Sequence, residues 1–435
     1  MHLSSSFLVP GALLVSTLLP NVALAAETQP AISGADTVWV LVCAALVMLM
    51  TPGLALFYGG MVRAKNVLST LMHSFACVGL VTLLWITVGY SLAFSPGNAF
   101  IGGFDHVMLA GVDGSTVGTI PHGAFMIFQL MFAIITPAII SGAFAERIKF
   151  RAFVLFTLAW SLLVYVPVCH WVWGPDGWLA SGSTWHALDF AGGTVVHISS
   201  GVAGLVMALV LGRREGRGDV EHRPHNLPLT MLGAGLLWFG WFGFNAGSAL
   251  GVEGVATHAF VVTHTSAAMG TLAWMFTERL HTGRVSLLGA ASGAIAGLVA
   301  ITPACGFVEV SSSMLIGAIA GVICYFGVQL KGRLGVDDSL DAFGLHGVGG
   351  AWGALATGLF ASATVGGTAG LLANGGSQVI VNQLMGIVAV GGYAAIVTLL
   401  IARALQATVG LRVTASEERE GLDELHGEQG YALST

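Results

Sequence analysis

The stretch DFAGGTVVHISSGVAG at residues 189–204 returns in outline as DSLDAFGLHGVGGAWG at residues 338–353. In each copy an aspartate is followed eight residues later by a histidine, and then by two glycines at one shared spacing. Aspartate and histidine are costly inside a membrane, and where they occur there they usually mark a functional site. We call this repeated pattern, Asp189 to Gly204 and Asp338 to Gly353, the skeleton. A polar pattern that recurs in two distant apolar segments predicts an internally duplicated pore or binding site.

Composition places the whole chain in a membrane. Of its 435 residues, 55% are hydrophobic and only 9% are charged, and the mean hydropathy is +0.84. Soluble proteins carry about 25% charged residues. The chain has no basic cluster of the kind that binds nucleic acid, and no hydrolase, Walker, metal-ligand or cofactor motif. We therefore expect a polytopic all-α membrane protein that is not an enzyme and uses no cofactor.

Apolar segments of spanning length, about 20 residues, predict eleven transmembrane helices. The Lys and Arg residues fall in every second connection or in the tail, which by the positive-inside rule makes those connections cytoplasmic. The N-terminus is then outside and the C-terminus inside. The eleven segments lie at about 36–60, 67–94, 122–144, 151–169, 190–211, 226–248, 256–278, 285–303, 312–330, 341–361 and 378–403.

The orientation turns the two skeletons upside down relative to each other. Asp189 heads the fifth segment, which runs inward, and Asp338 heads the tenth, which runs outward. Each histidine lies about 12 Å along its helix from the aspartate, so both reach the middle of the bilayer from opposite sides. The expected architecture is two inverted five-helix repeats plus a final helix, with the functional site where the repeats meet.

Three regions follow from this layout. Residues 1–25 are typical of a signal peptide, with an apolar run before a small-x-small site at Ala23–Ala25. The alternative is an uncleaved extra helix, because the segment starts without Lys or Arg. Residues 36–403 form the transmembrane domain. Residues 404–435, with their acidic end, form a cytoplasmic regulatory tail.

His197 and His346 are the candidate pore residues. A neutral imidazole donates at one nitrogen and accepts at the other, so two of them bonded together offer a polar track and a proton relay. Asp189 and Asp338 are first of all helix caps, since a carboxylate there accepts backbone N–H bonds. Asp189 has a second interpretation, as negative potential beside a cation site.

A cluster of aromatic residues and one serine maps to the outer half of the predicted bundle. Phe128 and Phe132 share one helix face, and Phe244 precedes Ser248 at the outer end of the sixth segment. Aromatic faces attract cations, and a serine oxygen accepts an N–H bond. With Trp173, for which Trp171 and Trp178 of the same loop are alternatives, these residues suit a small cation that carries protons.

Long strings of the chain resemble the ammonium transporters of the Amt/Rh superfamily, and the bacterial Amt branch in particular. The resemblance covers nearly the whole of the chain after its first segment. The strings are TPGLALFYGGMVRAKN at 51–66, GAFAERIKF at 142–150, LDFAGGTVVH at 188–197, RPHNLP at 223–228, GWFGFNAGS at 240–248, SLLGAASGAIAGLVAITPACG at 286–306, VDDSLDAFGLHGVGG at 336–350, and LRV followed by EEREGLD within 411–423.

The resemblance implies roles for individual residues. His197 and His346 correspond to twin pore histidines. Phe132, Trp173 and Ser248 correspond to an outer ammonium site shaped by Asp189. Phe132 and Phe244 correspond to a stacked gate, with Phe128 as a further ring of the pore lining, and Asp338 to a structural helix start.

The resemblance also implies a homotrimer in a bacterial inner membrane, with a PII-type protein as a partner at the cytoplasmic loops and tail. The implied activity recruits NH₄⁺ outside, removes a proton, and conducts NH₃ with coupled proton transfer; methylammonium would serve as an analogue. Two other functions stay open. One is an ammonium sensor. The other is a membrane redox protein in which the two histidines ligate haem.

Overall fold

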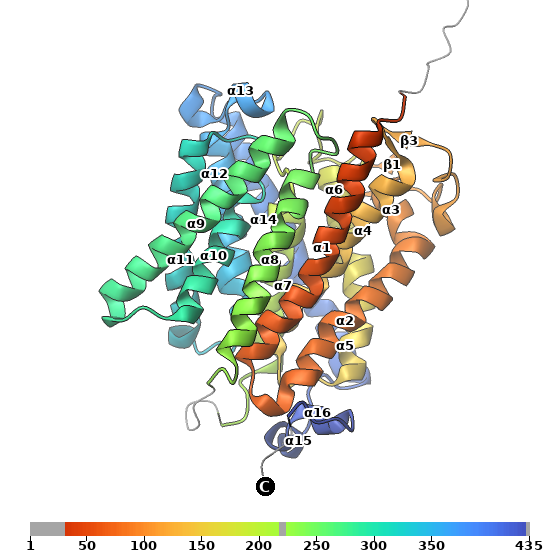
Figure 1. The fold of residues 1–435 in the computed structure, drawn as a ribbon. Helices are drawn as coiled ribbons and strands as arrows, with labels where there is room; N and C mark the ends of the chain where they lie inside the picture. Colours follow the sequence, from red (N-terminus) through yellow and green to blue (C-terminus); the bar gives the residue numbers. More distant parts are fainter. Residues whose placement is uncertain (1–30, 217–222, 432–435) are drawn as a thin grey trace, which may run out of the picture.

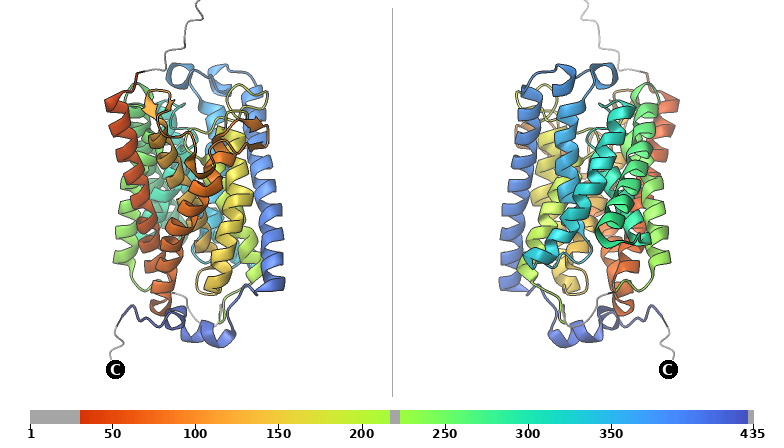
Figure 2. Two further views of the ribbon diagram at one scale, coloured as in Figure 1. Left: turned by 90° about the vertical axis from the view of Figure 1, so that its right-hand side faces the viewer. Right: turned by 90° about the vertical axis from the view of Figure 1, so that its left-hand side faces the viewer.

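Long, roughly parallel helices form the molecule, as the computed structural model shows for residues 31–216 and 223–431 (Figures 1 and 2). Eight helical runs are long and apolar enough to cross a membrane. This confirms the expectation of an all-helical, multi-pass membrane protein. The eight runs are α1 (Gly34–Met61), η1–α3 (Ala64–Phe94), α4–η4 (His122–Phe144), α5–α6 (Phe150–Trp173), η6–α7 (Gly193–Leu211), α8 (Leu227–Gly247), α11 (Val310–Leu334) and α14 (Gln378–Thr408).

The other three expected segments are helical too. They coincide with α9 (Val255–Thr282), with the shorter apolar helix α10 (Leu287–Ile301), and with η7 (Phe343–Gly347) followed by α12 (Val348–Phe360). Each of the eleven apolar segments therefore has a helical counterpart. The number of membrane crossings and the direction of the chain across a membrane stay predictions.

The composite runs contain short changes of helix type. The second run consists of η1 (Ala64–Asn66), α2 (Val67–Leu84), the π-helical turn η2 (Trp85–Gly89) and α3 (Tyr90–Phe94). The fourth consists of α5 (Phe150–Trp160), the π turn η5 (Ser161–Tyr165) and α6 (Val166–Trp173), and the third ends in η4 (Gly142–Phe144). The helical part of each skeleton also begins with a π turn. η6 (Gly193–Ile198) precedes α7 (Ser199–Leu211), and η7 precedes α12. Such turns are rare and are frequent at functional sites.

The few strands of the described chain lie in one connection, between α3 and α4. They form two-residue antiparallel pairs, so the fold is helical in all but this detail. The elements there are β1 (Gly97–Asn98), β2 (Ile101–Gly102), η3 (Val107–Leu109), β3 (Thr116–Val117) and β4 (Ile120–Pro121).

Glycines, of which the chain has 61, let the helices approach closely. A Cβ on Gly297 of α10 would lie 2.3 Å from the Ser266 carbonyl oxygen of α9, and a Cβ on Gly317 of α11 would lie 2.1 Å from the same atom. No side chain fits at either position, so α9, α10 and α11 pack backbone to backbone. Small residues at helix contacts are the usual means of packing in membranes.

The two skeleton-bearing helices run in opposite directions through the centre of the molecule. α12 leads to α13 (Ala363–Gly366) and η8 (Leu371–Ala373) at one end, whereas α7 ends near the C-terminal segment at the other (Figure 1). The short helices α15 (Ala415–Glu420) and α16 (Leu422–Leu425) lie across that second end (Figure 2). For brevity we call the end with α13 the outer end and the end with α15 and α16 the inner end, following the orientation that the charges predict.

Candidate functional site

The two skeleton histidines meet in the middle of the bundle. The Nδ1 atoms of His197 and His346 lie 3.1 Å apart, and their ring centroids are separated by 5.2 Å. Both side chains are buried, with 1% and 4% of their surface exposed. One Nδ1 must donate and the other accept, so a single proton lies between the two rings. The two histidines are 149 positions apart in the sequence, and the fold brings them together in one site.

Aspartate caps fix the backbone ahead of each histidine. Asp189 accepts bonds from the backbone N–H groups of Gly192 and Gly193 at 2.8 and 2.6 Å, and also from those of Thr194 and Val195. Asp338 accepts from the N–H groups of 342 and 343 at 3.1 and 2.8 Å. A carboxylate that takes up the free N–H groups of a helix start stabilises that start. Both caps precede the π turn that carries the histidine.

A narrow passage surrounds the histidine pair. Its free volume is about 10 Å³, at the lower limit of what a single water molecule needs. Its walls are apolar except for the two imidazoles. The lining residues are Met50, Leu54, Phe57, Ile135, Ile139, His197, Leu237, Trp241, Phe244, Ile295 and His346.

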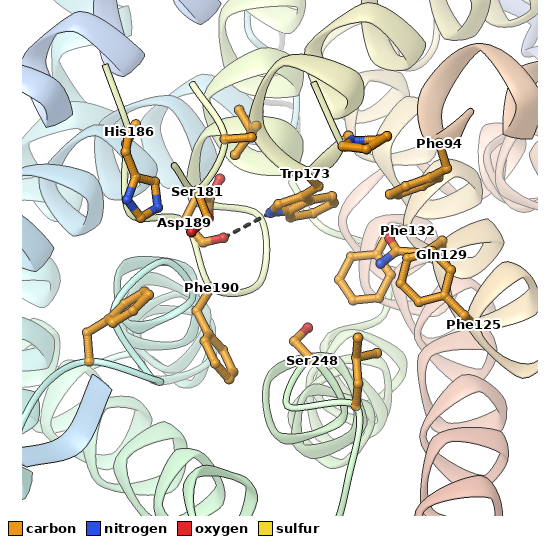
Figure 3. A pocket seen from close by; sticks show the side chains of 17 residues that line it. Phe94, Phe125, Gln129, Phe132, Trp173, Ser181, His186, Asp189, Phe190 and Ser248 are labelled. Carbon is orange, nitrogen blue, oxygen red and sulfur yellow. Dashed lines mark hydrogen bonds between the residues drawn. The ribbon is translucent and has the colours of Figure 1, made fainter. Parts of the chain in front are cut away.

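A much larger cavity of about 450 Å³ lies on the outer side of this passage. Figure 3 shows the side chains that line it. Phe132, Trp173, Asp189 and Ser248 all line it. The rings of Phe132 and Trp173 meet edge to face at 5.9 Å and 86°. The indole N–H of Trp173 donates to the Asp189 carbonyl oxygen at 2.9 Å, which fixes the ring at the cavity wall.

The hydroxyl of Ser248 donates its hydrogen to the Phe244 carbonyl oxygen at 2.9 Å. Its oxygen lone pairs therefore stay available to accept a bond from a ligand that carries N–H groups. Aromatic faces and a hydroxyl acceptor on one wall favour a small cation over an anion.

A pair of phenyl rings separates the cavity from the passage. Phe132 and Phe244 have ring centroids 4.2 Å apart, tilted by 32°, and each is 1% exposed. Phe132 lines the outer cavity, whereas Phe244 lines the passage. Phe128 packs behind Phe132 at 5.0 Å and lines neither space, so it supports the gate from the side.

The three tryptophans of the outer loop have different surroundings. Trp171 donates to the Phe100 carbonyl oxygen at 2.9 Å and packs against Trp178 and Tyr393. Neither Trp171 nor Trp178 lines the outer cavity, and Trp173 does. The geometry therefore favours Trp173 as the aromatic residue of this site.

Trp241 is a residue of the passage that the sequence patterns did not single out. Trp241 stacks on His197 at 5.5 Å and 30°, and its indole N–H donates to the Thr302 hydroxyl at 2.9 Å. Its spacing of three residues before Phe244 on α8 was the available signal, because residues three apart share a helix face. Gln129 and His186, which line the outer cavity, were missed as well.

Comparisons with known proteins agree on one family. Residues 38–431 match the Ammonium Transporter Family. An ammonium transporter of Bacillus subtilis is 54% identical over 403 residues, which cover 91% of this chain and 98% of the relative. One of Aquifex aeolicus is 50% identical over 425 residues, 97% of this chain and 98% of the relative.

Solved structures are similar over the same length. The crystal structure of Saccharomyces cerevisiae Mep2 has a TM-score of 0.83 and 37% identity, covering 88% of each chain. A structure named Sensor Amt Protein has a TM-score of 0.84 and 29% identity, covering 91% of this chain and 98% of its own. Matches of this extent and identity leave one assignment: this chain belongs to the ammonium transporter family.

Proposed function

We propose that this protein recruits NH₄⁺ in the outer cavity, removes a proton at the phenyl gate, and conducts NH₃ past the two histidines. The cation is held by Phe132, Trp173 and Ser248, with Asp189 shaping the site. The observation that carries the proposal is the order of the spaces: a polar aromatic cavity, a closed gate of Phe132 and Phe244, then a narrow apolar passage.

The apolar passage would supply selectivity against potassium. Moving an unpaired ion into an apolar interior costs tens of kcal/mol in the idealised limit. Ammonium avoids this cost by crossing as NH₃, and potassium has no proton to lose. A passage of about 10 Å³ also leaves no room for a hydration shell.

The paired imidazoles would give NH₃ a hydrogen-bonded path through these apolar walls. They would also relay the released proton, since the bond between the two Nδ1 atoms can carry it from one ring to the other. In this mechanism NH₃ and the proton travel separately and recombine at the inner end. The transport is then electrogenic.

The test is a current measurement on protein reconstituted in liposomes, with ammonium, methylammonium and potassium compared. We expect currents with ammonium and methylammonium and none with potassium. An ammonium flux without current would leave the substrate correct and refute the proton relay. A potassium current equal to the ammonium current would refute the selectivity mechanism.

Replacing a passage histidine tests the role of the pair. We expect His197→Ala to abolish selective ammonium flux or to admit potassium, because the path loses half of its polar surface. His264→Ala is the matched control, since His264 is an exposed histidine of α9 that packs against Trp238 outside the passage. Wild-type flux and selectivity in His197→Ala would contradict the relay.

The wider assignments belong to the same proposal. We infer a homotrimer in a bacterial inner membrane, with residues 36–403 as the transmembrane domain and 404–435 as a regulatory tail that a PII-type protein can bind. Residues 1–25, the expected signal peptide, lie outside the described residues. What supports these inferences is the family membership and the tail docked across the inner end.

Sensing is the second candidate function, favoured by the likeness to the Sensor Amt Protein. A sensor would bind ammonium without passing current, so the same liposome measurement separates the two. Haem ligation has the geometry against it. The two imidazoles are hydrogen-bonded directly to each other at 3.1 Å, and the free volume of about 10 Å³ around them leaves no room for a porphyrin between the rings.

A further inference from the structure

The wall of the outer cavity carries a histidine to which nothing above assigns a role. His186 lies in the connection between α6 and η6 and is half-buried. Figure 3 shows its ring beside Ser181 and Asp189, on the opposite side of the cavity from Phe125 and Phe132. It therefore shares one space with the residues proposed to hold the cation.

Charge in this cavity is sparse. Among the described residues that line it, Asp189 is the only titratable side chain besides His186, and backbone N–H groups and the Thr194 hydroxyl surround its carboxylate. Asp176 and Glu309 lie close in sequence to residues that line the cavity. Their carboxylates accept hydrogen bonds away from it, Asp176 from the N–H of residue 97 and Glu309 from the hydroxyls of residues 362 and 364.

We propose that protonation of His186 controls ammonium binding in the outer cavity, so that the site weakens as the outside becomes acidic. This rests on the proposed function. The neutral imidazole leaves the cavity without a positive charge, whereas the imidazolium adds one that repels the incoming cation. Ammonium stays protonated between pH 7.5 and pH 5, so a change of its binding over that interval originates in the protein.

The size of the cavity makes the effect measurable. A space of about 450 Å³ holds several waters besides one cation, which gives His186 access to outer protons. Two unit charges about 10 Å apart in a partly hydrated site interact strongly enough to change affinity by roughly three- to fivefold. Burial also lowers the pKa of His186 below the ordinary 6.5, so the change falls on the acid side of that value.

The experiment is the apparent KM of the ammonium current against outer pH, from pH 7.5 to 5, at fixed inner pH. We expect the wild-type KM to rise at least about threefold on acidification. His186→Gln should show the neutral-pH KM at both pH 7.5 and pH 5. His186→Arg should show the raised KM at every pH, because its charge does not titrate.

The control is His106→Gln, since His106 is an outer-end histidine that does not line the cavity, and it should keep the wild-type pH profile. The proton gradient created by acidifying the outside would alter the maximal current of wild type and His186→Gln alike. It is thereby distinguished from a rise in KM that only the wild type shows. A His186→Gln variant with the wild-type rise in KM, or a His186→Arg variant with the neutral KM, would overturn this inference alone. Absence of any ammonium current in the wild type would instead overturn the proposed function.

Discussion

Glu146 is the residue on which the charges of the inner end converge. Its carboxylate is 1% exposed and accepts bonds from Arg63 and Asn66 on one oxygen and from Arg214 at 2.8 Å on the other. Burial alone would raise the pKa of Glu146, but Arg214 and Arg63 lower it to about 2. Because the folded pKa lies below the ordinary 4.5, this carboxylate stabilises the fold above pH 4.5. That contribution is lost as the pH falls towards 2.

We expect Glu146→Gln to destabilise the protein at pH 7 by about 3 kcal/mol, because buried Arg214 loses a charged partner. Thermal unfolding in detergent measures this. The difference from the wild type should shrink at pH 3, where the wild-type carboxylate begins to protonate. Glu253→Gln, at an exposed carboxylate outside any buried ion pair, should leave Tm unchanged. An equal Tm for Glu146→Gln and wild type at pH 7 would show that the ion pairs of Glu146 contribute nothing to the stability of the folded protein.

At the scale of elements, the contact between α7 and η7 sets the distance between the histidines. A Cβ on Gly201 would lie 2.2 Å from the backbone nitrogen of Gly347, directly after His346. Real Cβ atoms do not come so close to backbone, so a side chain there must push the two elements apart. The hydrogen bond of 3.1 Å between the two Nδ1 atoms joins the two segments that would be pushed apart.

We therefore expect Gly201→Ala to reduce ammonium flux at least about tenfold, because a displacement of about 1 Å in an aligned site can cost on the order of a hundredfold in rate. The flux assay in liposomes measures it. Gly235→Ala is the matched control, since a Cβ at Gly235 of α8 meets nothing within 4 Å. Full flux in Gly201→Ala would mean that the helices relax without disturbing the pair.

At the scale of the whole molecule, the C-terminal segment holds the inner end together. Asp423 of α16 accepts bonds from the backbone N–H groups of Leu68 and Ser69 at 3.1 and 2.8 Å. It thereby caps α2, a helix whose own N-cap residue, Asn66, makes no side-chain hydrogen bond to the helix itself. The carboxylate of Glu418 in α15 forms an ion pair with Arg412 and accepts a hydrogen bond from the backbone N–H of Glu215. These contacts attach the tail to the segment that follows α7.

We expect Asp423→Ala to lower stability by about 1 kcal/mol, the usual cost of losing an N-cap side chain, with helix content unchanged. Circular dichroism and the thermal midpoint in detergent measure the two quantities. Glu424→Ala, at the exposed neighbour, should leave both as in the wild type. If both variants melt at the wild-type midpoint, the tail rests on α2 without stabilising it.

The sequence by itself determined the class of the protein, the positions of its helices and the inverted relation of the two skeletons. Hydropathy, charge distribution and repeated spacing are local properties, so they are readable without contacts. Only the tertiary structure decided that the two histidines share one proton between Nδ1 atoms, that π turns carry them, and that Trp241 stacks on His197. It also placed Trp173 in the cavity wall and left the alternatives Trp171 and Trp178 outside it, and it placed His186 in the same wall. Those outcomes depend on side-chain directions across helices far apart in sequence, which no local pattern records.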